Sequence, residues 1–138
     1  MSPSQWRAFL LDRARPAMLS TTRADGRPHL APIWFDLDGD ELVFTTAATS
    51  VKGRAIERDG RVAICVDDER PPFAYVLIEG QARIDPNPDA LRRWATVIGG
   101  RYMGADRADE YGARNGVEGE RLVRVPLHTV VARSGIAD

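Results

Sequence analysis

The stretch TTAATSVKGRAIER, residues 45–58, carries the change from strand to helix around which the rest of the chain is arranged. A strand pattern ends there and small polar residues turn the chain. Ser50 is placed to cap a short helix, because its hydroxyl can accept from the free backbone N–H groups of the first turn. The residue three positions on is Gly53, so no acidic residue completes a capping box. The pattern predicts a helix that begins after Ser50 and ends near Asp59 and Gly60.

Cations follow Ser50 at the positive end of this predicted helix. Lys52 and Arg54 are each unfavourable there by about 0.3–1 kcal/mol unless an anion is bound. Backbone N–H groups at a helix start, hydroxyls and two cations together suit a phosphate. Lys52 is also the only lysine in the chain. The alternative is a solvated amphipathic helix whose cations point into water, and the local pattern leaves both interpretations open.

Length and composition narrow the class of protein. With 138 residues the chain is expected to form one domain, residues 1–138. Its net charge of −1 gives no reason to expect nucleic acid or an anionic membrane as a partner. The single cysteine, Cys65, fits a reduced buried thiol and excludes an intramolecular disulfide. No signal peptide and no membrane-spanning apolar run are evident, so a cytoplasmic protein is expected.

Outward from the central stretch, strand patterns alternate with helical ones. Strands are expected at residues 17–23, 28–38, 41–46, 61–67, 74–84 and 121–132. Helices are expected after the caps Ser2 and Asn87, each followed by a proline at the first helical position. Residues 104–119 fit a loop or a short helix over an opening. Short strands with interspersed helices predict a mainly β domain with peripheral helices, built as a small antiparallel barrel.

Two of the predicted strands contain residues that interrupt a regular ladder. Residues 28–38 are apolar on both faces, which suits a barrel wall with a ligand or a partner subunit outside it. Pro32 lacks a backbone donor, so this strand is expected at a sheet edge or at a split in the sheet. Gly80, in residues 74–84, is expected to form a bulge that bends the strand.

Four segments together carry a resemblance to a known family: ADGRPHLAPIWF at 24–35, SVKGR at 50–54, DGRVAICVDD at 59–68 and YVLIEGQARI at 75–84. With them, the chain from Ala17 to Val131 resembles the pyridoxamine 5'-phosphate oxidase-like flavin-binding split barrels. Within that family it resembles the branch that uses the deazaflavin coenzyme F420. The resemblance implies a split β-barrel that forms a homodimer, with two equivalent cofactor sites in grooves between the subunits.

The resemblance also implies which residues bind the cofactor. The positions at the helix start, where the phosphate is held, are Ser50, Lys52, Gly53 and Arg54. The positions along the ring and its edge are Pro32, Ile33, Trp34, Thr45, Thr46 and Ala47. Phe73 and Tyr75 would close the groove, from the same or from the partner subunit. Trp34 could equally be a core residue.

A departure from the FMN-binding oxidases bears on the choice of cofactor. Those enzymes usually place an arginine on the strand before the phosphate site, whereas here residues 41–49 read ELVFTTAAT, without a cation. Weaker retention of FMN would follow, which favours the deazaflavin. The function implied is an F420H2-dependent oxidoreductase that transfers a hydride to a flat, largely apolar organic acceptor. The alternatives are an FMN-dependent oxidoreductase of the same fold and a non-catalytic F420 or flavin carrier.

Other chemistry has little support in the sequence. The two histidines, His29 and His128, have no cysteine or carboxylate at metal-ligand spacing, so no metal site is expected. No serine lies in a nucleophile-elbow motif. A dedicated general acid is not required, because solvent can protonate an acceptor after the hydride has arrived. Tyr75 is the candidate if such an acid exists.

Overall fold

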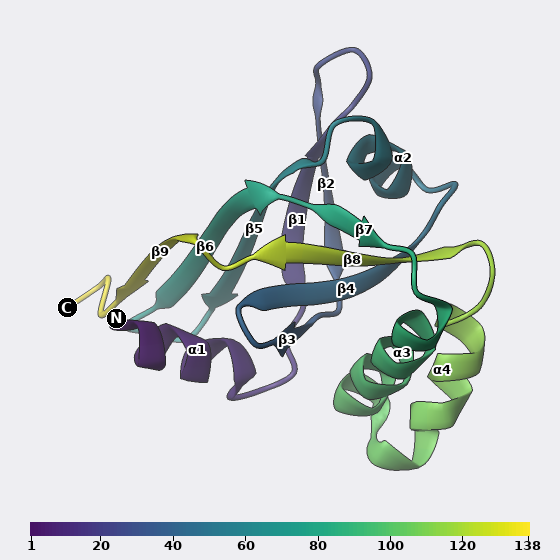
Figure 1. Ribbon diagram of the computed structural model, residues 1–138. Helices are drawn as coiled ribbons and strands as arrows, with labels where there is room; N and C mark the ends of the chain where they lie inside the picture. The colour runs from purple at the N-terminus through teal and green to yellow at the C-terminus, as the bar shows by residue number, and fades with distance from the viewer.

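The computed structural model describes residues 1–138. Two antiparallel sheets make up most of it, and the chain passes between them several times (Figure 1). The five-stranded sheet has the order β2 (Pro28–Ile33), β1 (Ala17–Thr22), β5 (Arg61–Asp68), β6 (Ala74–Gln81), β9 (Thr129–Ser134). The four-stranded sheet has the order β3 (Asp36–Asp38), β4 (Glu41–Ala47), β8 (Glu120–Pro126), β7 (Arg83–Asp85). The expected mainly β architecture, a split barrel with peripheral helices, is confirmed.

Three of the predicted strands are each two strands in the structure. Residues 28–38 divide into β2 and β3, residues 74–84 into β6 and β7, and residues 121–132 into β8 and β9. In each case the chain passes from one sheet to the other at the break. The break between Ile33 and Asp36, next to Pro32, confirms the split expected there, and β2 is also a sheet edge.

The bulge expected at Gly80 is wrong. The register between β5 and β6 continues without interruption through Val62 opposite Gly80 and Arg61 opposite Gln81. A Cβ atom on Gly80 would lie 3.3 Å from Cγ1 of Val125, which belongs to the other sheet. The glycine therefore allows β8 to pass close to β6, and the strand ends one residue later, at Gln81.

Four α-helices lie around the sheets: α1 (Pro3–Leu11), α2 (Val51–Arg58), α3 (Pro88–Met103) and α4 (Ala108–Asn115), with a short 3-10 helix, η1 (Ala105–Arg107), before α4. The caps expected at Ser2 and Asn87 are present. Of the two alternatives for residues 104–119, the helix is confirmed by η1 and α4. Helices α3 and α4 pack together beside the end of the four-stranded sheet (Figure 1). None of the helices is long and apolar enough to cross a membrane.

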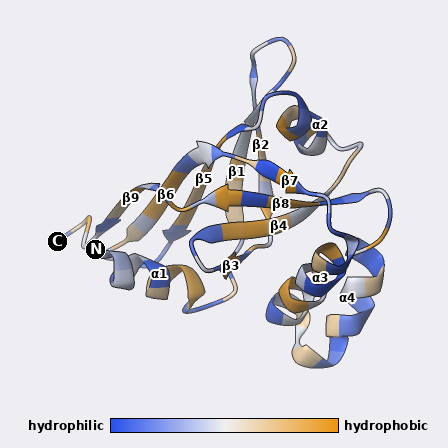
Figure 2. Cartoon of the chain, viewed as in Figure 1, coloured by the Kyte–Doolittle hydropathy of each residue, from blue (hydrophilic) through white to orange (hydrophobic).

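The hydrophobic core lies between the two sheets, and hydrophobic residues gather along β4 and β6 in Figure 2. Its largest fully buried side chains include Phe35, Phe44 and Ile64. A second, smaller cluster joins Trp94 and Ile98 of α3 to the four-stranded sheet. Cys65 is half-buried rather than buried, because its strand turns it away from the core. Partial burial raises the pKa of its thiol.

Candidate functional site

A cavity of about 320 Å³ lies where the end of β4, the start of α2 and helix α3 meet. Eight of the eleven predicted cofactor-binding residues line it: Pro32, Ile33, Trp34, Thr45, Thr46, Ala47, Ser50 and Lys52. They come from the junction between β2 and β3, from β4 and from the start of α2. The fold thus brings separate segments of the sequence to one concave surface.

The start of α2 is fixed by Ser50. Its hydroxyl accepts from the N–H of Gly53 (3.0 Å), donates to the carbonyl of Ala47 (2.8 Å) and lies 3.0 Å from the hydroxyl of Thr46. The expected helix cap is confirmed, and this hydroxyl is already committed to partners within the chain. A Cβ atom on Gly53 would lie 2.2 Å from the carbonyl oxygen of Ala47. Gly53 therefore permits the close approach of helix and turn.

Lys52 is the one cation among the residues that line the cavity. It is half-buried, and its ammonium makes no hydrogen bond or ion pair within the chain. The one carboxylate on the same lining is Glu120, the first residue of β8. Burial raises the pKa of Glu120, and the positive charge of Lys52 acts in the opposite direction. The ionisable groups of the cavity are thus one ammonium and one carboxyl.

Arg54 lies outside the cavity, on another side of α2. It is exposed and lines a separate hollow of about 310 Å³ together with three other arginines, Arg23, Arg27 and Arg58. Residues two positions apart on a helix do not face each other, which separates Arg54 from Lys52. Within one chain, the two cations predicted to share the phosphate therefore point to different hollows.

Trp34 forms an aromatic wall of the cavity. Its ring stacks on Tyr102 of α3, with centroids 5.1 Å apart and an interplanar angle of 6°. Tyr111 of α4 meets it edge to face at 5.6 Å. The hydroxyl of Tyr102 accepts from the N–H of Phe35 (3.2 Å) and donates to the carbonyl of Arg15 (2.7 Å). Trp34 is therefore both packed on its neighbours and part of the cavity lining.

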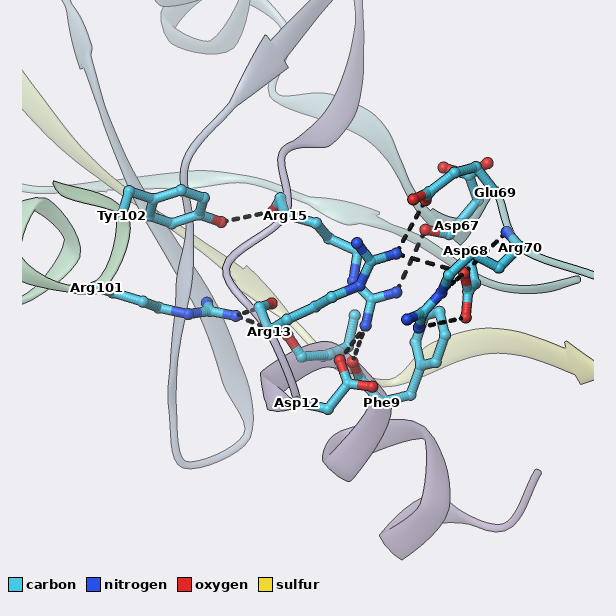
Figure 3. Close-up of polar contacts among 11 residues, drawn as sticks. Phe9, Asp12, Arg13, Arg15, Asp67, Asp68, Glu69, Arg70, Arg101 and Tyr102 are labelled. Carbon is cyan, nitrogen blue, oxygen red and sulfur yellow. Dashed lines mark hydrogen bonds and ion pairs between the residues drawn. The ribbon is translucent and has the colours of Figure 1, made fainter. Parts of the chain in front are cut away.

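A polar network holds the junction that carries Trp34. Figure 3 shows the part of this network around Arg13, Arg15 and Arg101. The guanidinium of Arg101 donates to the carbonyls of Phe35, Leu10 (2.8 Å) and Arg13 (3.2 Å). Arg15 donates to the carbonyl of Phe9 (2.9 Å) and to Asp12. The junction is thereby attached to α1 and to the segment that leads into β1.

The network continues to the end of β5 (Figure 3). Arg13 pairs with Glu69 (2.9 Å) and Asp68 (3.3 Å), and Arg70 pairs with Asp68 (2.9 Å). The hydrogen bonds from Arg70 hold the pKa of Asp68 well below its usual range. The acidic residues Asp68 and Glu69 at the end of β5 thus have a structural role, and they lie outside the cavity lining.

The two remaining aromatic candidates lie elsewhere in the chain. Phe73 is 40% exposed, has a φ of 69° and lines a hollow formed with Pro71, Pro72 and Ser134. Tyr75 stands opposite Asp67 and Arg133 in the ladder of the five-stranded sheet. Neither lines the cavity in this chain. No group of histidine, cysteine and carboxylate residues is placed to hold a metal ion.

The structure adds four residues to the cavity that were not predicted as ligands: Ala95, Ile98, Asn115 and Glu120. Ala95 and Ile98 were recognisable only as members of the apolar face of α3. Asn115 ends α4, and Glu120 begins β8, in a segment with no local motif. Asn115 is placed by the packing of α4 against α3, and Glu120 by the pairing of β8 with β4, contacts that no pattern within residues 104–119 indicates.

The chain is similar in sequence and in fold to proteins of one known family. Residues 2–130 match the pyridoxamine 5'-phosphate oxidase family. An F420H(2)-dependent biliverdin reductase from Mycobacterium tuberculosis (strain CDC 1551 / Oshkosh) is 31% identical over 85 residues. That alignment covers 62% of this chain and 61% of the relative's length.

Solved structures extend the similarity to nearly the whole chain. A conserved hypothetical protein from Mycobacterium tuberculosis is 26% identical with a TM-score of 0.86, over 98% of this chain and 86% of that one. An F420 reductase is 28% identical with a TM-score of 0.69, over 90% and 94% of the two chains. A FAD and heme binding protein from Mycobacterium smegmatis shares the fold, with a TM-score of 0.74, 19% identity, and coverage of 96% and 70%.

Proposed function

The chain belongs to the pyridoxamine 5'-phosphate oxidase family, and from that premise we propose that it transfers a hydride from reduced coenzyme F420 to a flat, largely apolar organic acceptor. The coarser assignment, an oxidoreductase dependent on F420 or on a flavin, is supported by the family and by the similar proteins named for F420. The finer one is supported by a single observation. The cavity joins an unpaired ammonium at a helix start to an aromatic wall.

The residues of the cavity fit a cofactor with a ring and a phosphate. Lys52 and the first N–H groups of α2 would hold the phosphate. Trp34 lines the cavity, is held in place by Tyr102 and would supply an aromatic contact to the ring. Thr45 and Thr46 supply hydroxyls beside the turn. When bound, the deazaflavin would supply the hydride, while the protein binds, orients and excludes water.

We also propose a homodimer, supported by the outer face of the five-stranded sheet. The ladders align one residue from each strand into an apolar row: Pro32, Met18, Cys65, Leu77 and Val131. Met18 and Val131 are each 38% exposed, and Leu30 beside the row is 63% exposed. A second copy would bury this row, and in the dimer Phe73 and Tyr75 would come from the partner subunit.

The dimer is tested by sedimentation. An obligate-type interface should give about twice the chain mass at micromolar concentration. A charge placed in the row, by Met18→Asp, should shift the chain towards the monomer. A monomer that still binds the cofactor tightly would contradict a groove shared between subunits.

One experiment separates the three functions. Purified protein is titrated with F420 and with FMN, and reduced F420 is then mixed with the protein and a panel of quinones, tetrapyrroles and unsaturated rings. The proposal expects F420 to bind and at least one acceptor to be reduced faster than in free solution, without peroxide. Tight binding of FMN with formation of peroxide would favour the FMN-dependent alternative. Binding of F420 with no acceleration across the panel would favour the carrier.

A further inference from the structure

Glu120 is fixed beside the proposed phosphate position by the backbone. It stands directly opposite Ala47 in the ladder between β4 and β8. The preceding residue, Gly119, accepts a hydrogen bond from the N–H of Ala48 (2.9 Å). The start of β8 is therefore fastened to the turn that leads into α2. This attachment keeps the Glu120 side chain on the cavity lining with Lys52.

The charged residues around Glu120 come from α2, from β7, from the segment before β8 and from β8 itself. Lys52 of α2 shares its cavity, while Asp85, Glu118 and Arg121 line a second hollow on its other side. Asp85 is already bound to Arg124 at 2.9 Å. Arg121 directs its guanidinium to the Glu120 carbonyl at 3.4 Å, rather than to the carboxylate. In the cavity itself, the carboxyl of Glu120 thus meets one opposing charge, that of Lys52.

A phosphate bound beside Lys52 would experience both groups. The attraction of Lys52 grows with the charge on the phosphate, but the repulsion from an ionised Glu120 grows in the same proportion. The cost of removing the anion from water remains, and it rises faster than its charge. A phosphate monoester carries about −1.5 to −2 charges at neutral pH, whereas a diester carries about −1. Lys52 and Glu120 together therefore disfavour a phosphate monoester relative to a diester.

We propose that Glu120 is a specificity-determining residue, which makes the cavity select a singly charged phosphodiester over a doubly charged phosphomonoester. The inference rests on the proposed phosphate position beside Lys52. F420 contains a phosphodiester and FMN a phosphomonoester. Glu120 would then act on the choice between the two cofactors without contacting either ring.

The test uses two ligands that differ by one methyl group on the phosphate, and therefore in its charge: FMN and its 5'-phosphate monomethyl ester. Their dissociation constants are measured by flavin fluorescence at pH 8, for the wild type and for Glu120→Gln. The wild type should bind the ester more tightly than FMN. Removing the carboxylate should tighten FMN about tenfold, or about 1.4 kcal/mol, and the ester about threefold or less. The matched control is Glu118→Gln, which removes a nearby carboxylate that does not line the cavity.

A second measurement on the wild type does not depend on any variant. Lowering the pH from about 8 to about 5 protonates the monoester towards a single charge and also favours protonation of Glu120. The preference for the ester should shrink over this range. The inference is overturned if Glu120→Gln leaves the ratio of the two dissociation constants unchanged, or if Glu118→Gln changes it equally.

The proposed function has its own readout in the same series, because F420 is titrated alongside the two flavins. If F420 binds the wild type while the ratio fails to respond to Glu120→Gln, only the role of Glu120 is lost. If none of the three ligands binds, or if Lys52→Glu leaves their affinities unchanged, the phosphate position itself is wrong and the inference falls with it.

Discussion

Two cation-rich regions of this molecule are built differently. Where α1 leads into β1, the guanidinium groups of Arg13, Arg15 and Arg101 all find carbonyl or carboxylate partners (Figure 3). At the start of α2, the side chains of Lys52 and Arg54 have no hydrogen-bonding or ionic partner within the chain. Each cation of the first group is bonded within the fold, whereas those of the second group remain available to a ligand.

Burial explains the difference for Arg15 and Arg101. The side chain of Arg15 is only 6% exposed, and a cation so far from water must be paired or its burial is strongly unfavourable. Lys52 is half-buried at the positive end of a helix, where water partly solvates it. Substitutions in the first region should therefore change stability, and substitutions in the second should change binding.

Arg101→Met should have the largest effect on folding. It removes a guanidinium that bonds three carbonyls and lies over the Phe35 ring at 4.8 Å, while it keeps most of the apolar stem. Because each bond to a charged donor contributes about 1.5–3 kcal/mol, we expect the free energy of unfolding to fall by about 3 kcal/mol. Urea unfolding measures it. A loss below about 1 kcal/mol would mean that the network does not hold the junction.

Lys52→Glu should weaken cofactor binding and change stability little, the reverse of what we expect for Arg101→Met. The dissociation constant for F420 should rise by a factor equivalent to about 2 kcal/mol or more, because an attractive contact is replaced by a repulsive one. The stability of the empty protein should change little, since the helix start gains an acid while Glu120 loses the attraction of Lys52. Fluorescence titration and urea unfolding on one sample give both values. Arg54→Glu is the matched control, and an equal loss of affinity there would place the phosphate in the other hollow.

Tyr102→Phe should have an intermediate effect. The change removes the hydroxyl that joins Phe35 N–H to the Arg15 carbonyl, but it retains the ring stacked on Trp34. We expect a loss of stability of about 1–2 kcal/mol, because two backbone groups lose their partner. Urea unfolding measures this loss, and Tyr111→Phe serves as a comparison on the other aromatic neighbour of Trp34. No change in stability would show that water replaces the hydroxyl.

Acidification should give the smallest effect, tested on Asp68 at the edge of the first region. Arg70 lowers the pKa of Asp68 in the folded state. The ionised carboxylate therefore stabilises the protein at any pH above the ordinary pKa of an aspartate, about 4. That contribution is lost as the pH falls below about 4. Asp68→Asn should therefore lose less stability than the wild type between about pH 5 and pH 2.5, as measured by urea midpoints. A steeper loss in the variant would contradict the direction of the shift.

Local patterns were sufficient for much of the fold and for part of the site. Caps at Ser2, Ser50 and Asn87 depend on neighbouring residues, so the sequence locates the helix starts. Hydrophobic runs predict the strands. They do not predict most of the points where the chain passes from one sheet to the other, because the alternation of residues continues through a bend. Pro32 was the exception, because its missing donor marks a break.

The site shows the same limit. Lys52 and Trp34 carry local signals, an unpaired cation at a helix start and an aromatic residue at a strand break. The position of Arg54 follows from helical geometry, which separates residues two apart. Asn115 reaches the cavity through the packing of α4 on α3, and Glu120 reaches it through the pairing of β8 with β4. Contacts between distant segments were therefore the part that sequence patterns did not contain.

A crystal structure of this chain with oxidised F420 tests the central claim most directly. We expect a phosphate oxygen at about 2.7–2.9 Å from the ammonium nitrogen of Lys52, next to the first N–H groups of α2, and the deazaflavin ring in contact with Trp34. A phosphate seated among Arg23, Arg54 and Arg58, or a ring that does not contact Trp34, would contradict it.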